Sequence, residues 1–349
     1  MTPRPRFAAA LLGVCIGTAC AQAPPPRAPP RFPPASVWNQ DVSALPADAD
    51  SAAMIASSVA WGGDAAGSTR FQIDFSMHVL YRSWGGAVDT PLVEESDYYV
   101  PDCDTGERVP LPAVGAIEGS TDYTCDYGGE DCHLLVAAGD DLYESYHSSV
   151  DGDGLHSQCL VRWRLNFVYP PAGRGDGCTS ADAAGFPIAP LIFGPDEVHA
   201  AMQSGGTLGH ALRFILHNDR IRAGVYVHPA SHVGAPSGPT GAIPYGARLR
   251  LKPTFDTRGY GAAARVILDT LKRYGMFLAD GGSIPLSADD GLFQTHHWDD
   301  ADLALDSYSL FGVRLDDFDV MPIGTPVPID DCARNGAGDD VVFADGLDR

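Results

Sequence analysis

Segments that alternate between apolar and polar side chains recur along this chain, and they constrain its fold more than any other feature. The clearest is CLVRWRLNFV, residues 159–168, in which Val161, Trp163 and Leu165 share one face and Arg162 and Arg164 point the other way. A period of two residues predicts a β-strand with one buried face. Further strands are predicted in FQIDFSMHVLYRS (71–83), CHLLVAA (132–138), HALRFILH (210–217), GVYVHP (224–229) and ARLRLKPTF (247–255).

Helical segments are fewer. Residues 195–205, PDEVHAAMQSG, start with acids and stop at a glycine, and residues 261–275, GAAARVILDTLKRYG, combine an apolar stripe with basic residues at the C-terminal end. A third helix is predicted over residues 298–309, WDDADLALDSYS, with Asp299 or Asp300 as its N-cap. Many short strands with two or three helices predict a mainly β fold, a sandwich or jelly roll with the helices packed at one side.

The N-terminus has the pattern of a secretory signal peptide. Arg4 and Arg6 precede an apolar run that is too short to span a bilayer, and residues 19–21 fit a small-x-small cleavage site. Proline fixes φ and removes a donor, so the following APPPRAPPRFPP is expected to be an extended spacer. We therefore expect a signal peptide at 1–21, a Pro-rich spacer at 22–36, one β-rich globular domain at 37–330, and an acidic, Gly-rich tail at 331–349.

Cysteine usage agrees with export to an extracellular or periplasmic location. Two of the eight cysteines leave with the signal peptide, and an even number remains for an oxidising compartment. This predicts three disulfides, with all pairings left open. The six cysteines are Cys103, Cys125, Cys132, Cys159, Cys178 and Cys332.

Charge and motifs exclude several classes of function. A formal net charge of −22 repels phosphate backbones, so we expect no nucleic-acid partner. No segment after the signal peptide has the length and apolarity for membrane insertion. The chain lacks G-x-S-x-G, G-x-x-x-x-G-K-[ST], H-E-x-x-H and a G-x-G-x-x-G in strand–helix context, so no cofactor is predicted.

Two carboxylates are candidates for acid–base chemistry. Glu144 lies between aromatic residues in DLYESYH, and apolar neighbours raise the pKa of a carboxyl group as a general acid requires. The alternative is that Glu144 is a solvated residue on a strand face. Asp182, in TSADAAGFPI, either caps a short helix or is buried and paired with Arg213 or Arg164.

Histidines and one further acid complete the candidate set. His210 shares an apolar strand face, as a core histidine or as a site residue at the end of the strand. In HPASH, His228 and His232 have the spacing of a metal pair, but Pro229 forbids an ordinary helix interior and no Glu follows His228. Asp280 lies just past the best helix in a Gly-rich turn.

An ordered series of blocks across residues 176–302 resembles a family of secreted bacterial proteins. The blocks are TSADAAGFPI, DEV, HALRF, PASH and LKRYGMFLADGGS. The resemblance implies that His210, Arg213, His232 and Asp280 belong to recurring blocks, and it carries no catalytic assignment. Two positions depart from the family pattern. Cys178 replaces a usual Trp, which suggests a disulfide particular to this chain, and Ser231 stands where Arg often precedes the second histidine.

Together these features predict an exported enzyme that acts on a polysaccharide or other extracellular glycan, as a glycoside hydrolase or polysaccharide lyase. One alternative is a non-catalytic module that binds glycans or cell surfaces through Trp and Tyr side chains. Another is a metal-dependent hydrolase that uses His228 and His232. The candidate catalytic residues are Glu144, Asp182, His210 and His232, and the candidate substrate-binding residues are Arg213, His133, Tyr146, Trp163 and Asp280.

Overall fold

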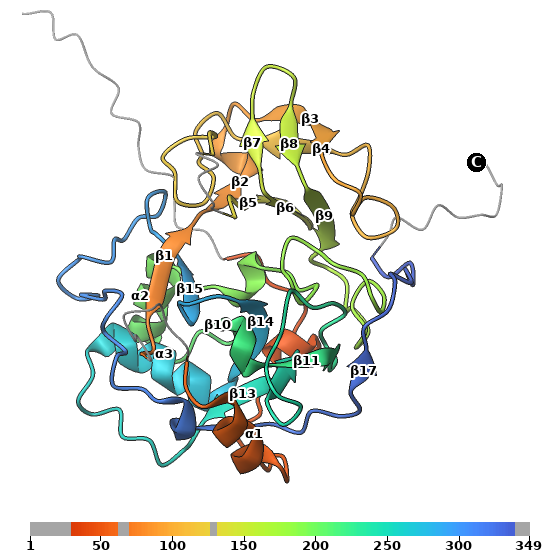
Figure 1. The fold of residues 1–349 in the computed structure, drawn as a ribbon. Helices are drawn as coiled ribbons and strands as arrows, with labels where there is room; N and C mark the ends of the chain where they lie inside the picture. The colour runs from red at the N-terminus through yellow and green to blue at the C-terminus, as the bar shows by residue number, and fades with distance from the viewer. Residues whose placement is uncertain (1–28, 62–69, 126–130, 339–349) are drawn as a thin grey trace, which may run out of the picture.

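The alternating segments form strands of a six-stranded mixed sheet in the lower half of Figure 1. A computed structural model describes residues 29–61, 70–125 and 131–338. In the sheet β10 runs parallel to β14 and antiparallel to β15, so the ends of β10 and β14 meet at the same edge. The strand order is β1 (Ile73–Met77), β15 (Leu286–Asp289), β10 (Leu212–Leu216), β14 (Met276–Gly281), β13 (Arg248–Leu251) and β16 (Phe318–Val320).

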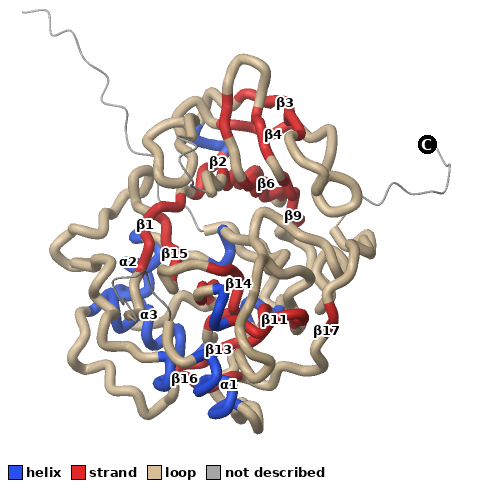
Figure 2. Tube along the Cα trace, in the orientation of Figure 1, coloured by secondary structure: helices blue, strands red, loops and turns tan. Residues whose placement is uncertain are grey.

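Smaller sheets complete a mainly β protein with sandwich-like packing, which confirms the predicted fold class (Figures 1 and 2). Two of them lie in the upper half of Figure 1. One contains β2 (Val79–Tyr81), β5 (Leu134–Ala138), β6 (Asp141–Tyr146) and β9 (Cys159–Arg164). The other contains β4 (Arg108–Leu111), β3 (Val88–Glu94), β8 (Leu155–Ser157) and β7 (Ser149–Val150), and a three-stranded sheet contains β12 (Ile243–Tyr245), β11 (Ile221–Tyr226) and β17 (Val327–Pro328).

Two of the three α-helices in the described residues, α1 (Ser51–Ser58) and α3 (Ala262–Arg273), pack on strands of the six-stranded sheet. Helices α2 (Pro195–Ser204) and α3 contact each other, and α3 packs on β13 with its predicted apolar stripe buried. Helix α1, which the sequence did not indicate, packs on β16 and β12. The structure also contains the short 3₁₀ helices η1 (Val37–Asn39), η2 (Arg82–Trp84), η3 (Ala189–Leu191), η4 (Asn218–Arg220) and η5 (Leu315–Asp317).

Two predicted elements are wrong, and the strand β14 includes Asp280, for which the sequence predicted a Gly-rich turn after the helix. Residues 298–309 form turns instead of a helix, because the Asp300 carboxylate accepts the His297 N–H and Leu303 and Leu305 are buried two positions apart. Residues 71–83 are not one strand, since the chain leaves the lower sheet at His78 and continues as β2 in an upper sheet. The Asp289 carboxylate accepts the Val79 N–H at 3.0 Å at this break.

All six predicted cysteines form disulfides, which confirms three bridges. The pairs are Cys103–Cys159, Cys125–Cys132 and Cys178–Cys332. The last of these joins the loop before the predicted TSADAAG block to the start of the predicted tail. Ala333 and Asn335 continue this attachment, because their N–H groups donate to the carbonyls of Asp176 and Arg174.

The packed body also includes part of the predicted spacer. Phe32 is buried against Trp163 and Tyr169, and Arg31 reaches the Glu197 carboxylate at 2.7 Å. The predicted signal peptide and the last eleven residues lie outside the described residues. In the described part of the chain, none of the helices has the length and apolarity needed to cross a bilayer.

Candidate functional site

A cavity of about 400 Å³ lies between the upper sheets and the edge of the six-stranded sheet. It brings together five of the predicted site residues, His133, Tyr146, Asp182, His232 and Asp280. The sequence did not indicate Tyr98, Asp131 or Thr179, which also line it and come from loops without a periodic pattern. The cavity is therefore built from segments more than 180 residues apart in the chain.

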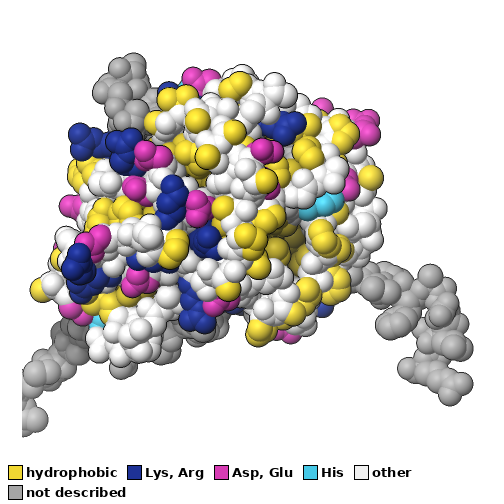
Figure 3. Space-filling view, turned by 90° about the horizontal axis from the view of Figure 1, so that it is seen from below, with side chains coloured by type: hydrophobic (Ala, Val, Ile, Leu, Met, Phe, Trp, Pro, Cys, Tyr) yellow, Lys and Arg dark blue, Asp and Glu magenta, His cyan; other side chains and the backbone are white. Residues whose placement is uncertain are grey.

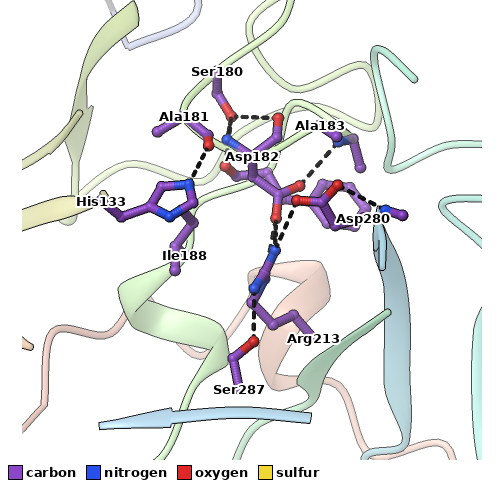
Figure 4. A network of polar contacts seen from close by, with 12 residues as sticks. His133, Ser180, Ala181, Asp182, Ala183, Ile188, Arg213, Asp280 and Ser287 are labelled. Carbon is purple, nitrogen blue, oxygen red and sulfur yellow. Dashed lines mark hydrogen bonds and ion pairs between the residues drawn. The ribbon is translucent and has the colours of Figure 1, made fainter. Parts of the chain in front are cut away.

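Beneath the cavity one guanidinium holds two carboxylates (Figure 4). Arg213, on β10, donates from Nη2 to Asp182 Oδ2 at 2.7 Å and lies 3.4 Å from Asp280 Oδ2 at the end of β14. Its Nη1 donates to Ser287 Oγ at 2.9 Å. Strands β10 and β14 are parallel neighbours, and their register pairs Asp280 with Ile215, two residues beyond Arg213, so the long Arg213 side chain spans this offset to reach Asp280. This confirms the predicted pairing of Asp182 with Arg213.

Asp182 is fixed by the loop that carries it. Its Oδ1 accepts the Ala184 N–H at 3.0 Å, and the Ser180 hydroxyl accepts the Asp182 N–H. The predicted helix-capping geometry is thus a tight Asx and Ser turn without an α-helix. The side chains of Asp182 and Arg213 are 0% and 1% exposed, so neither presents appreciable surface to a ligand.

Asp280 is the carboxylate of this cluster that solvent reaches, with 22% of its side chain exposed. Burial and the negative charge of Asp182 raise the pKa of Asp280 to about 7, against the opposing effects of Arg213 and of the Gly281 N–H. A carboxyl group with a pKa near neutrality exchanges protons readily under physiological conditions. Asp280 therefore combines partial exposure with the raised pKa that the sequence predicted for Glu144.

His133 is a buried imidazolium that holds the wall of the cavity. Its Nδ1 lies 2.6 Å from Glu118 Oε2, and its Nε2 donates to the carbonyl of Ala181 at 2.9 Å. Burial disfavours the charge, but Glu118 outweighs it and raises the pKa of His133 to about 9. In return, His133 overcomes burial and holds the pKa of Glu118 at about 2. With both ring nitrogens bonded, His133 positions the Asp182 loop and is not free to act as a base.

His232 is better placed for proton transfer. Its Nδ1 donates to the carbonyl of Ala183 at 3.0 Å, which fixes the tautomer and leaves Nε2 as the nitrogen available to a ligand. The ring lines the same cavity as Asp280. In the same loop Ser231, which replaces the usual Arg of the family pattern, donates its hydroxyl to the carbonyl of Cys178 at 2.8 Å.

Four predicted site residues do not line the cavity: Glu144, Trp163, His210 and Arg213, which lies beneath it. Glu144 is fully buried, not solvated, and its carboxylate accepts the N–H groups of Ile188 and Ala189 at 2.7–2.9 Å. Burial raises the pKa of Glu144 to about 7 despite these bonds, yet no ligand can touch it. Glu144 lies next to η3, where its carboxylate binds the backbone N–H groups at the start of this 3₁₀ helix. Trp163 packs in the core against Phe32 and Tyr169.

His210 is a core histidine. Its Nδ1 donates to the carbonyl of Ala211 at 2.8 Å, and its Nε2 accepts from Arg31 at 2.7 Å. Burial and the adjacent Arg31 charge lower the pKa of His210, against the opposing effect of Glu197. The imidazole is therefore neutral and satisfied, at a distance from the cavity-lining residues.

The HPASH pair does not converge on one point. His228 Nε2 lies 2.8 Å from Asp176 Oδ1, whereas His232 turns to Ala183. Within residues 29–61, 70–125 and 131–338, no group of three or more His, Cys, Asp or Glu side chains is arranged to hold a metal ion.

Comparison with known proteins adds no assignment: no family model, no curated protein and no solved structure matches this chain.

Proposed function

We propose that the protein is an exported carbohydrate-active enzyme, a glycoside hydrolase in preference to a lyase, that uses Asp280 as its proton-transferring carboxyl group. The observation that carries the proposal is Asp280 itself. It is a partly exposed carboxyl group with a pKa near neutrality, in a polar cavity that also contains a tautomerically fixed histidine. Glycosidic bond cleavage requires a carboxyl group that is protonated at working pH and a second group that activates water or attacks the sugar.

The roles follow from exposure. Asp280 donates a proton to the leaving glycosidic oxygen, and His232 Nε2 accepts a proton from the attacking water. Arg213 and Asp182 are positioning residues, because they set the location and the pKa of Asp280 without surface of their own. The rings of Tyr98 and Tyr146 at the cavity supply faces on which sugar rings stack.

The test is release of reducing ends from a panel of polysaccharides by the disulfide-bonded protein. Asp280→Asn is expected to lower the rate by about 100-fold or more, as expected for loss of a general acid. His232→Gln is expected to lower it by about tenfold to 100-fold. The wild-type rate is expected to fall as the pH rises through about 7, because only the protonated form of Asp280 donates.

Matched controls change the same residue types outside the cavity. His228→Gln changes the other histidine of HPASH, and Asp219→Asn changes an exposed carboxylate outside the cavity; both are expected to keep wild-type rates. Sugar release that survives Asp280→Asn would contradict the assignment.

A non-catalytic glycan-binding protein is the second candidate. It is favoured by Tyr81, Trp84 and Phe293, half-buried rings whose centroids follow one another at 5.4 and 5.5 Å outside the cavity. Retention on an insoluble polysaccharide without any release of reducing ends would select this candidate.

A further inference from the structure

The charged groups around the cavity do not balance. Arg213 is compensated by Asp182, which leaves Asp280 without a cation of its own. His133 is compensated by Glu118. Asp131, an exposed residue on the cavity wall, adds a further carboxylate. The cavity therefore carries more negative than positive charge when its carboxyl groups are ionised.

The two cations present are hidden from a ligand. The side chains of Arg213 and His133 are 1% and 3% exposed, and their nitrogens are bonded to the groups named above. No Lys or Arg side chain is among the described residues that line the cavity. Elsewhere the charge is mixed: on the face seen from below in Figure 3, Lys and Arg side chains lie beside Asp and Glu. A ligand entering the cavity thus meets carboxylates and no accessible guanidinium or ammonium group.

Aromatic rings accompany these carboxylates. Tyr98 is 46% exposed and Tyr146 is half-buried, and both line the cavity with Asp131. Burial and then the charges of Asp131 and Asp280 raise the pKa of Tyr146, so both carboxylates act on this ring. Carboxylates and aromatic rings that line one cavity can together bind an ammonium group, the carboxylate by ion pairing and the ring by cation–π attraction.

We propose that the cavity selects a glycan with a free amino group, whose ammonium form binds beside Asp131 and the Tyr98 ring, and rejects polymers of uronic acid. The inference rests on the proposed function for the identity of the ligand as a saccharide. The amine occupies the cavity wall at Asp131, so Asp280 is left to transfer a proton to the glycosidic oxygen of the adjoining sugar. A uronate in the same position would face Asp131 with no accessible cation to offset the repulsion.

The test compares binding of three tetrasaccharides by isothermal titration: a chitosan tetramer with free amines, its fully N-acetylated counterpart and a galacturonate tetramer. We expect the free amine to bind about fivefold to tenfold tighter than the acetylated form, as for one solvent-exposed ion pair, and the uronate to bind most weakly. The preference for the amine is expected to fall as salt is raised, since an exposed ion pair is screened.

Two variants locate the effect. Asp131→Asn is expected to reduce the preference for the amine to less than about twofold while the acetylated tetramer binds as before. Asp153→Asn removes an exposed carboxylate from the turn between β7 and β8, outside the cavity, and is expected to leave the preference intact.

The failures of the two proposals are distinguishable. Equal binding of all three tetramers, tighter binding of the uronate, or a preference that survives Asp131→Asn would overturn the charge selectivity alone. Failure of all three to bind, with reducing ends still released from another glycan, would also overturn only the selectivity. Failure to bind, with no release from any glycan, would overturn both proposals.

Discussion

Two arginines in this molecule, the buried Arg213 and the partly buried Arg31, form ion pairs with nearly the same donor–acceptor distance in different electrostatic settings. Arg213 donates to Asp182 at 2.7 Å and Arg31 to Glu197 at 2.7 Å. Around Arg31 the additional partner is His210, which is neutral and accepts a hydrogen bond. Around Arg213 the additional partner is Asp280, a second carboxylate that opens on the cavity. The Arg31 cluster is balanced, whereas the Arg213 cluster has one carboxylate in excess.

The difference separates a cluster with a structural role from the cluster that contains our proposed proton-transferring group, Asp280. The balanced cluster around Arg31 holds residues 29–32 against α2 and η3. Its groups are not expected to exchange a proton at neutral pH. An unbalanced cluster must either take up a proton or bind a cation, because an uncompensated buried charge is costly. When it is ionised, the excess carboxylate therefore destabilises the folded protein at the cavity. Ionisable groups whose pKa values are shifted in this way are common at catalytic sites.

The largest effect is expected from removing the guanidinium of the unbalanced cluster. Arg213→Met leaves Asp182 buried without its partner and is expected to lower the free energy of unfolding by about 3–5 kcal/mol. Urea denaturation monitored by circular dichroism measures it. Adding Asp182→Asn to Arg213→Met should recover part of this loss, since no buried charge then remains. Arg314→Met, at an exposed arginine, is the control and should leave stability unchanged within error.

Neutralising one carboxylate in each cluster is expected to change the free energy of unfolding in opposite directions. Glu197→Gln removes a needed partner of Arg31 and should lower the free energy of unfolding by about 2 kcal/mol. Asp280→Asn removes the excess charge and should raise the free energy of unfolding by about 1 kcal/mol while activity is lost.

The effect of Asp280 on stability is expected to depend on pH. The pKa of Asp280 is raised to about 7 in the folded protein, so the stability that its protonated form contributes is present below about pH 4 and is lost as the pH rises through 7. The gain from Asp280→Asn should therefore be larger at pH 8 than at pH 5 in thermal unfolding. A loss of stability in Asp280→Asn at pH 8 would contradict the comparison.

Much of this difference lies beyond what the sequence could predict. Alternation identified β9 and β10, and helix patterns identified α2 and α3, because these elements bury one face of a regular repeat. The same regularity placed Arg213 on β10, whereas Asp280 was predicted in a Gly-rich turn and lies in the strand β14. It could not place Arg31, which reaches His210 from a segment whose prolines predicted a spacer. Nor could it show that the backbone of Ile188 and Ala189 would occupy the carboxylate of Glu144.

The other residues around the cavity that the sequence did not indicate lie in loops. Asp131, Tyr98 and Glu118 lie in irregular segments, and no periodicity connects them with His133 or Tyr146. Their positions depend on long-range contacts such as the Cys103–Cys159 bridge and the ion pair of Glu118 with His133. Chemistry-bearing residue types were thus recognisable in the sequence, whereas their exposure, which decides their roles, was set by partners distant in the chain.

The last contrast concerns the pH dependence of two of the buried histidines, His133 and His210. The pKa of His133 is raised to about 9, so its contribution to stability is present below about pH 6.5 and lost as the pH rises towards 9. The pKa of His210 is lowered, so its contribution is present above about pH 6.5 and lost as the pH falls through its folded value. Thermal unfolding across this range should show that His133→Gln removes roughly 1–2 kcal/mol of the decline on the alkaline side. His210→Gln should leave that alkaline decline intact and flatten the acid side instead. If both variants changed the same limb, the two histidines would share one electrostatic setting, and the distinction between a balanced and an unbalanced cluster would not extend to their neighbours.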